Sequence, residues 1–150
     1  MHRAVDYFSD NNPVYLRSVH RLQQSYGKYS GIIMDMFYDY LLANNWSMFA
    51  SVDLKEFCKD AYAILSSHKH VMPEESRTIL TYMMKNDWLY SYRKTEGIRE
   101  ALKGMSQRMK YYFPMDKALN ELEKDKHLYN SDFVEFFPLL IRHTELYRTL

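Results

Sequence analysis

The chain has 150 residues, of which 47% are apolar and 26% charged, a composition typical of one folded globular domain. Its 20 basic and 19 acidic residues leave a formal charge of +1, which gives no electrostatic reason to expect nucleic-acid binding. A single cysteine, Cys58, excludes an intrachain disulfide and a cysteine-based zinc site, and it favours a reducing, cytoplasmic compartment. No apolar run approaches the roughly 20 residues of a membrane span, so we expect a protein without a membrane segment.

Turn-forming residues are scarce and bulky side chains are abundant. The chain has 4 glycines and 4 prolines, against roughly ten and roughly seven expected from average usage. It also has 14 tyrosines, 8 phenylalanines and 10 methionines. Few turn formers and many large side chains indicate long helices with short connections. We therefore predict an all-α protein, a single-domain multi-helix bundle that covers residues 1–150.

The first three predicted helices have clear ends. The run from Asn11 to Pro13 ends the first, and Asn12 followed by Pro13 is a good N-cap and first-turn pair for the second. Gly27 closes the second helix. The third runs from about Ser30 to Asn44 and is apolar almost throughout.

The middle of the chain predicts three more helices. Asp53 has the character of an N-cap, and Glu56 three residues later makes the pair close to a capping box. Pro73 begins the next helix and Thr95 begins the sixth. The helix that follows Asp53 carries apolar residues at helical spacing, which are Phe57, Ala61, Ile64 and Leu65.

The last part of the chain restarts at Pro114. The apolar spacing there predicts two helices with a break near Asn130–Ser131. Pro138 lies inside the second of them and should kink it or mark its true start, because proline has no backbone N–H to donate. We find no internal repeat, low-complexity segment or linker.

Two acidic residues interrupt the apolar third helix. Asp35 and Asp39 are four residues apart, so they project from the same helical face and repel each other. Carboxylates in such an apolar setting call for a compensating cation, either a metal ion or an arginine. They could equally lie at a solvent edge or accept hydrogen bonds from tyrosine and arginine.

A second polar face lies at the beginning of the chain. His2 and Asp6 are also four residues apart, and Asp10 continues that face. An imidazole and carboxylates in this arrangement can offer one nitrogen and several oxygens to Mn²⁺ or Mg²⁺. Alternatively, a carboxylate orients the histidine, or the charges only solvate an N-terminal helix.

A group of basic residues precedes Pro114. Arg99 and Lys103 share a helical face, and Arg108 follows shortly after. Such a group suits a phosphate or an acidic protein surface, although a run of charges is usually just a solvated face. The full group is Arg93, Lys94, Arg99, Lys103, Arg108 and Lys110.

The order of these segments resembles a known family, the acyl carrier protein phosphodiesterases. Residues 2–13, HRAVDYFSDNNP, are similar to the family's HRxID-x-(F/L)-T-D-x-x-P segment. Residues 35–46, DMFYDYLLANNW, are similar to its D-x-x-(Y/W)-D-H-F-L-x-x-x-W segment. Residues 86–92 and 97–108 agree as well, and the agreement runs in order across nearly the whole chain.

The resemblance implies an all-helical enzyme, distantly HD-domain-like. It would hydrolyse the phosphodiester between 4′-phosphopantetheine and a serine of holo-acyl carrier protein, with a divalent metal, typically Mn²⁺, as cofactor. By position, the metal ligands would be His2, Asp6 and Asp35. Asp39 and Asp10 become the candidate catalytic residues, and Arg3 and Arg108 the candidate phosphate contacts. Acyl carrier proteins are acidic, so Arg99 and Lys103 become candidate docking residues.

The sequence departs from the family pattern in two places. Tyr40 stands where the family usually has a histidine. The chain begins at the His2–Arg3 pair, whereas the family carries an earlier segment with a further aspartate, so we expect an N-terminally shortened domain. Two alternatives to the phosphodiesterase follow: a helical module that binds carrier protein without catalysis, or a phosphohydrolase of the same scaffold that acts on a small phosphodiester.

Overall fold

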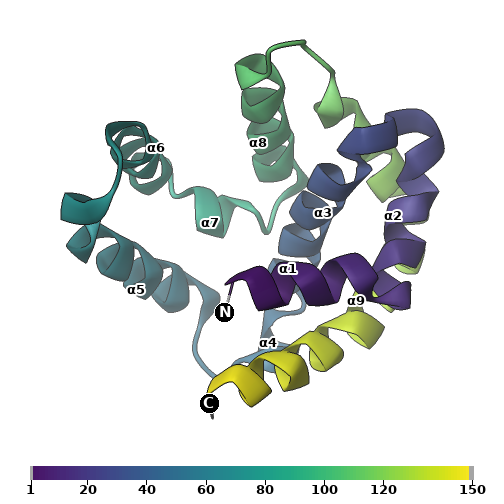
Figure 1. Cartoon of the computed structure of the whole chain (residues 1–150), viewed down its shortest axis with the longest axis horizontal. Coiled ribbons are helices and arrows are strands. Elements are labelled where there is room, and N and C mark those ends of the chain that lie inside the picture. Colours follow the sequence, from purple (N-terminus) through teal and green to yellow (C-terminus); the bar gives the residue numbers. More distant parts are fainter. Residues whose placement is uncertain (1, 149–150) are drawn as a thin grey trace.

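The computed structural model describes residues 2–148, and the side chains of residues 3–147 (Figure 1). All the regular structure in this part of the chain is helical, which confirms the predicted class. The α-helices are α1 (His2–Asn11), α2 (Pro13–Tyr26), α3 (Ser30–Asn44), α4 (Trp46–Phe49), α5 (Leu54–Ser67), α6 (Glu74–Lys85), α7 (Trp88–Ser91), α8 (Thr95–Arg108) and α9 (Leu119–Arg148). Short 3₁₀ helices are η1 (Gly27–Tyr29), η2 (Lys69–Val71) and η3 (Met115–Ala118).

The predicted helix ends at the N-terminal side are confirmed. The Asn12 side chain accepts a hydrogen bond from the backbone N–H of Val14 at 2.9 Å and a longer one from Tyr15, as an N-cap should. Gly27 ends α2 with a φ of 50°, in the left-handed region where a side chain would be strained. The third predicted helix coincides with α3.

Helix α3 lies at the centre of the main core. It packs against α2, α8 and α9, and it buries side chains on most of its circumference. Such all-round burial explains why its sequence is apolar without a clear polar stripe. The completely buried side chains of the core include Leu22, Ile33, Met34, Phe37, Leu41, Ile98, Leu102, Leu119 and Phe133. We call α1–α3, α8, η3 and α9 the body.

The predicted pair of helices is present as two segments of α9, but the break between them lies at Asp125 and not near Asn130–Ser131. Helix α9 continues through this point, and its non-helical residue is Asp125, with φ −115° and ψ 26°. The apolar face of α9 runs unbroken from Tyr129 to Phe136 against the core, which keeps the helix intact. The Asn130 carboxamide accepts a hydrogen bond from Asn45 at 2.8 Å, so it links two elements and does not form a turn. Helical dihedral angles persist through Pro138, which therefore does not mark the start of a helix.

Helices α5, α6 and α7 form a separate group, which we call the outer lobe (Figure 1). Its own core consists of Cys58, Tyr62 and Leu80, with a few half-buried neighbours. The apolar residues whose spacing predicts α5 are mostly not the buried ones: Phe57 is 45% and Ile64 61% exposed. Only the Cys58–Tyr62 face of α5 has α6 and α7 to pack against. None of the helices described combines the length and apolar character that crossing a membrane requires.

Candidate active site

Two pairs of aspartates, one from α1 and one from α3, line a single pocket. Asp6 and Asp10 lie one turn apart on α1, and Asp35 and Asp39 lie one turn apart on α3. Both helices pack against α9, so the four side chains meet in a cavity of about 550 Å³, which we call the carboxylate pocket. Aromatic and aliphatic walls surround them, including Tyr15, Tyr38, Phe133, Phe136, Phe137 and Leu140.

Two tyrosines of the pocket are held by hydrogen bonds. The Tyr15 hydroxyl donates to Asp35 Oδ1 at 2.6 Å, which fixes that carboxylate. The Ser18 hydroxyl donates to the buried Asp132 at 2.8 Å, and it lies 3.0 Å from the Tyr38 hydroxyl. Because Ser18 has one hydrogen and gives it to Asp132, the Tyr38 hydroxyl donates to Ser18. The polar atoms on this side of the pocket are thus anchored by α2 and α9.

The pocket is electrostatically costly for its carboxylates. Solvent reaches Asp35 and Asp39 through the mouth, but the protein around them displaces much of the surrounding water. This burial raises the pKa of Asp35, and the charges of Asp10 and Asp6 raise it further, against the opposing effect of the Tyr15 hydrogen bond. Burial, with a contribution from Asp35, raises the pKa of Asp39 to about 7. A bound cation would relieve these costs.

The donor set fits a hard divalent cation in its chemistry. Carboxylate oxygens are the ligands that Mg²⁺ and Mn²⁺ prefer. Among the described residues that line the pocket, none is lysine, arginine or histidine, so no such side chain neutralises it from within. In the described part of the chain, however, no three potential ligand side chains lie close enough to hold a metal ion as they stand. The predicted nitrogen ligand, the His2 side chain, lies outside the described residues.

The two predicted phosphate contacts differ in their relation to the pocket. Arg3 is exposed on α1 and is not among the pocket's lining residues. Arg108, at the end of α8, does not line the pocket either, but its charge acts on Tyr92. Burial raises the pKa of Tyr92 to about 12, with the Asp39 charge raising it and the Arg108 charge lowering it. Tyr92 is thus within electrostatic reach of both Asp39 and Arg108.

The predicted docking residues are paired with acidic neighbours on their own helix. Arg99 Nε lies 3.5 Å from a Glu96 carboxylate oxygen, and Lys103 Nζ lies 3.1 Å from one of Glu100. Both glutamates are largely exposed, so these pairs are weak and can rearrange when a partner approaches. Their effect is to reduce the positive charge that this face of α8 presents.

Tyr40 lies away from the carboxylate pocket. It is buried, and the ammonium of Lys126 lies 5.1 Å from the centre of its ring. Because successive residues of a helix point in different directions, Tyr40 faces α9 while its neighbour Asp39 lines the pocket. The departure from the family histidine therefore falls outside the carboxylate pocket.

A smaller cavity of about 160 Å³ adjoins the carboxylate pocket. Asp39 and Leu42 line both spaces. The small cavity is also lined by Trp46 of α4 and by Tyr92, which follows α7. Its walls around Asp39 are largely apolar.

Reasoning from the sequence finds the aspartates but misses the residues that hold and enclose them. Tyr15 gives no signal, because its contact with Asp35 joins two helices and depends on their packing. The aromatic wall is more visible: Phe133, Phe136, Phe137 and Leu140 have the spacing of one helical face. That spacing is as typical of an ordinary core as of a pocket.

The fold and the site together define a class of protein, an all-helical domain with an acidic pocket whose walls are aromatic. The chain belongs to the acyl carrier protein phosphodiesterase family, whose sequence model matches residues 1–140. This confirms the predicted family, which is one of enzymes.

Relatives that carry the same name cover almost the whole chain. The acyl carrier protein phosphodiesterase of Photorhabdus laumondii is 25% identical over 146 residues, which are 97% of this chain and 74% of that protein. That of Yersinia pestis is 23% identical over 97% of this chain and 76% of its own length. That of Escherichia coli O6:H1 is 22% identical over 94% of this chain and 74% of its own length. No solved structure matches the chain, so the distant likeness to HD-domain proteins stays a prediction.

Proposed function

We propose that this chain hydrolyses the phosphodiester between 4′-phosphopantetheine and a serine of holo-acyl carrier protein, with Mn²⁺ or Mg²⁺ as cofactor. The products are apo-acyl carrier protein and 4′-phosphopantetheine. The observation that carries the proposal is the convergence of four aspartates from two helices on one pocket, in a chain of this family. A phosphodiester is anionic, so a pocket of carboxylates can receive it only together with a cation.

The aspartates of the pocket divide into two roles. Asp6 and Asp35 would hold the cation, with His2 as the nitrogen ligand, and Tyr15 fixes Asp35 for this purpose. The cation would neutralise the phosphoryl oxygens and lower the pKa of the attacking water. Asp39, which lines the same pocket beside Asp35, would accept a proton from that water. Asp10 is the second candidate for this base.

The bond changes then balance without any further reactant. The water oxygen bonds to phosphorus, and the bond between phosphorus and the serine oxygen breaks. The serine oxygen leaves with a proton, which Asp39 can return. Arg108, whose charge acts on Tyr92, is the cation of α8 that would contact the phosphate. Arg3 stays a prediction as a phosphate contact.

The carrier protein itself would approach over α8. Arg99 and Lys103 lie on this helix, and an acidic partner would compete with Glu96 and Glu100 for their charges. Such exchange of exposed ion pairs costs little, because each pair contributes about 1 kcal/mol or less.

The test is to incubate the protein with holo-acyl carrier protein and Mn²⁺ and to measure the mass of the carrier protein over time. We expect loss of the phosphopantetheine mass, and none after the metal is removed with a chelator. Absence of turnover, together with no Mn²⁺ binding by calorimetry, overturns the proposal. Capture of carrier protein without hydrolysis identifies the chain as a binding module instead.

A further inference from the structure

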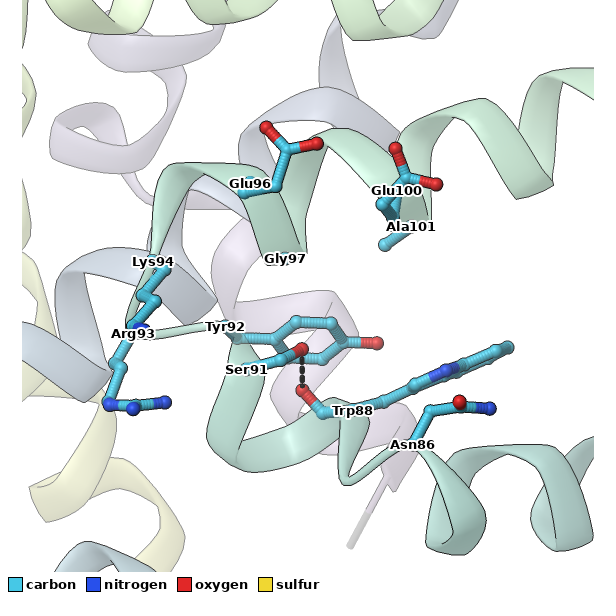
Figure 2. Close-up of a pocket in the computed structure, with 10 residues that line it drawn as sticks. All are labelled: Asn86, Trp88, Ser91, Tyr92, Arg93, Lys94, Glu96, Gly97, Glu100 and Ala101. Carbon is cyan, nitrogen blue, oxygen red and sulfur yellow. Dashed lines mark hydrogen bonds between the residues drawn. The ribbon is translucent and has the colours of Figure 1, made fainter.

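A second large pocket, of about 530 Å³, lies between α7 and α8. We call it the α7–α8 pocket. Figure 2 shows the rings of Trp88 and Tyr92 extending in the same direction, below the stretch of α8 that carries Gly97 and Ala101. Nothing in the proposed hydrolysis uses this space, although its size is similar to that of the carboxylate pocket.

The pocket's inner end depends on a close approach of backbone. A methyl group at Gly97 would overlap the carbonyl oxygen of Ser91, so only glycine lets α8 come this close to the end of α7. The Ser91 hydroxyl donates to the Trp88 carbonyl at 2.6 Å and closes that turn. Asp87, which precedes Trp88, has a φ of 48°, a left-handed conformation that is strained for a non-glycine residue. These features fix the position of the Trp88 ring opposite α8.

The lining suits an uncharged ligand that carries amides. Its walls are two aromatic rings and the small residues Gly97 and Ala101, which offer an apolar slot. In Figure 2 the carboxyl groups of Glu96 and Glu100 point away from the two rings, toward the far side of α8. The Asn86 side chain supplies an amide donor and an acceptor at the edge. The pocket's two cations, Arg93 and Lys94, lie on the segment that precedes α8, and the Arg93 guanidinium is held by the Tyr90 ring and the Tyr90 carbonyl oxygen, to which it donates.

The small cavity shares lining residues with both the α7–α8 pocket and the carboxylate pocket. Tyr92 lines both the α7–α8 pocket and the small cavity. Asp39 lines both the small cavity and the carboxylate pocket. A ligand with its phosphate at the aspartates would have to pass Tyr92 to reach Trp88.

We propose that the α7–α8 pocket binds the uncharged pantetheine chain of the substrate, with Trp88 and Tyr92 as its specificity-determining walls. This inference rests on the proposed function, since it takes the phosphodiester to lie in the carboxylate pocket. The pantetheine chain is flexible, neutral and carries amides, which matches the slot and its edge. The same placement directs the serine side of the phosphodiester away from α7, toward the carrier protein.

Binding can be measured without catalysis by tryptophan fluorescence, because the chain has only two tryptophans, Trp46 and Trp88. In the variant Trp46→Phe, fluorescence reports on Trp88 alone. We expect free pantetheine, which has no phosphate, to change the Trp88 emission in a saturable way. In the native protein, free pantetheine should also inhibit hydrolysis competitively, which keeps the test valid if Trp46→Phe does not fold.

Kinetics provide the second measurement. Trp88→Leu should raise KM for holo-acyl carrier protein about tenfold with kcat nearly unchanged, because the ring contacts a part of the substrate that does not react. Tyr111→Leu is the matched control, since Tyr111 is 73% exposed on the loop after α8, and it should leave KM as it is.

The outcomes separate this inference from the proposed function. Pantetheine binding at Trp88 without hydrolysis supports the pocket assignment and overturns the phosphodiesterase. Hydrolysis with no Trp88 response, no inhibition by pantetheine and a native KM in Trp88→Leu overturns the pocket assignment alone. If neither binding nor hydrolysis occurs, both are wrong.

Discussion

The body and the outer lobe both consist of helices with apolar residues at helical spacing, but they bury these apolar side chains to very different extents. In the body, α3 is enclosed by α2, α8 and α9, and Phe37 is completely buried. In the outer lobe, α5 packs against α6 and α7 on one face only, and Phe57 is 45% exposed. Burial of apolar surface supplies most of the stability of a fold. The body is therefore the stable part, and the lobe depends on it.

The two candidate binding spaces follow this division. The aspartates lie on α1 and α3 of the body, where packing and the Tyr15 hydrogen bond hold them. One wall of the α7–α8 pocket belongs to the body and the other to the lobe. Reaction chemistry demands exact geometry, whereas binding a flexible chain requires less exact positioning. The contrast between body and lobe thus corresponds to a contrast between reaction and recognition.

The largest expected effect is a loss of activity when the body, but not the lobe, is altered. Asp35→Asn should lower hydrolysis of holo-acyl carrier protein by about a hundredfold or more, because it removes a charge from the reacting site. Asp60→Asn on α5 is the matched control, an exposed aspartate of the lobe, and it should keep native activity. Rates are measured by mass spectrometry of the carrier protein. Equal losses in both variants would contradict the location of the chemistry in the body.

The second prediction compares stability directly. Phe37→Ala should lower the free energy of unfolding by about 3–5 kcal/mol, because it opens a cavity in the main core. Phe57→Ala should cost about 1 kcal/mol or less, since its ring is half exposed and contacts mainly Trp46. Urea denaturation measures both. Similar costs would mean that the lobe is as tightly packed as the body.

Sequence patterns predict helix ends better than they predict burial, and the reason is physical. Helix ends depend on local chemistry, so Asn12, Pro13 and Gly27 locate α2 correctly. Apolar spacing shows which residues could be buried, not whether another element will cover them, and Ile64 has no such cover. The break predicted near Asn130 is misplaced because the packing of Tyr129, Phe133 and Phe136 against the core keeps this part of α9 helical.

The candidate site shows the same limit. Spacing of four residues places Asp6 with Asp10 and Asp35 with Asp39, because a helix fixes that relation. The meeting of the two pairs depends on how α1 and α3 pack against α9. The hydrogen bond from Tyr15 and the linked cavities likewise arise only from tertiary packing.

A smaller effect is expected at the α2–α9 interface of the body. Asp132 is buried and accepts hydrogen bonds from Arg17 at 2.8 Å and from Ser18 at 2.8 Å. Asp132→Ala should cost about 2 kcal/mol, because Ser18 loses its buried partner and both Arg17 and Arg21 lose their ion pairs with Asp132. Glu100→Ala breaks an exposed pair with Lys103 and should cost less than about 0.5 kcal/mol. Thermal unfolding distinguishes the two.

The smallest expected effect is a dependence of stability on pH without metal, because the Asp39 side chain is exposed and solvent screens its charge. The folded protein raises the pKa of Asp39 from its ordinary value of 3.8 to about 7. Between these values the folded state binds more protons than the unfolded state, so stability falls as the pH rises from about 4 to about 7. Asp35 acts in the same direction.

The variant Asp39→Asn should therefore melt at a higher temperature than the native protein at pH 8 and at the same temperature at pH 4. Addition of Mn²⁺ at pH 8 should stabilise the native protein more than the variant, because the cation compensates the charge that the variant lacks. A variant that melts with the native protein at both pH values would show that the pocket imposes no cost on this carboxylate, and that water, not a cation, balances its charge.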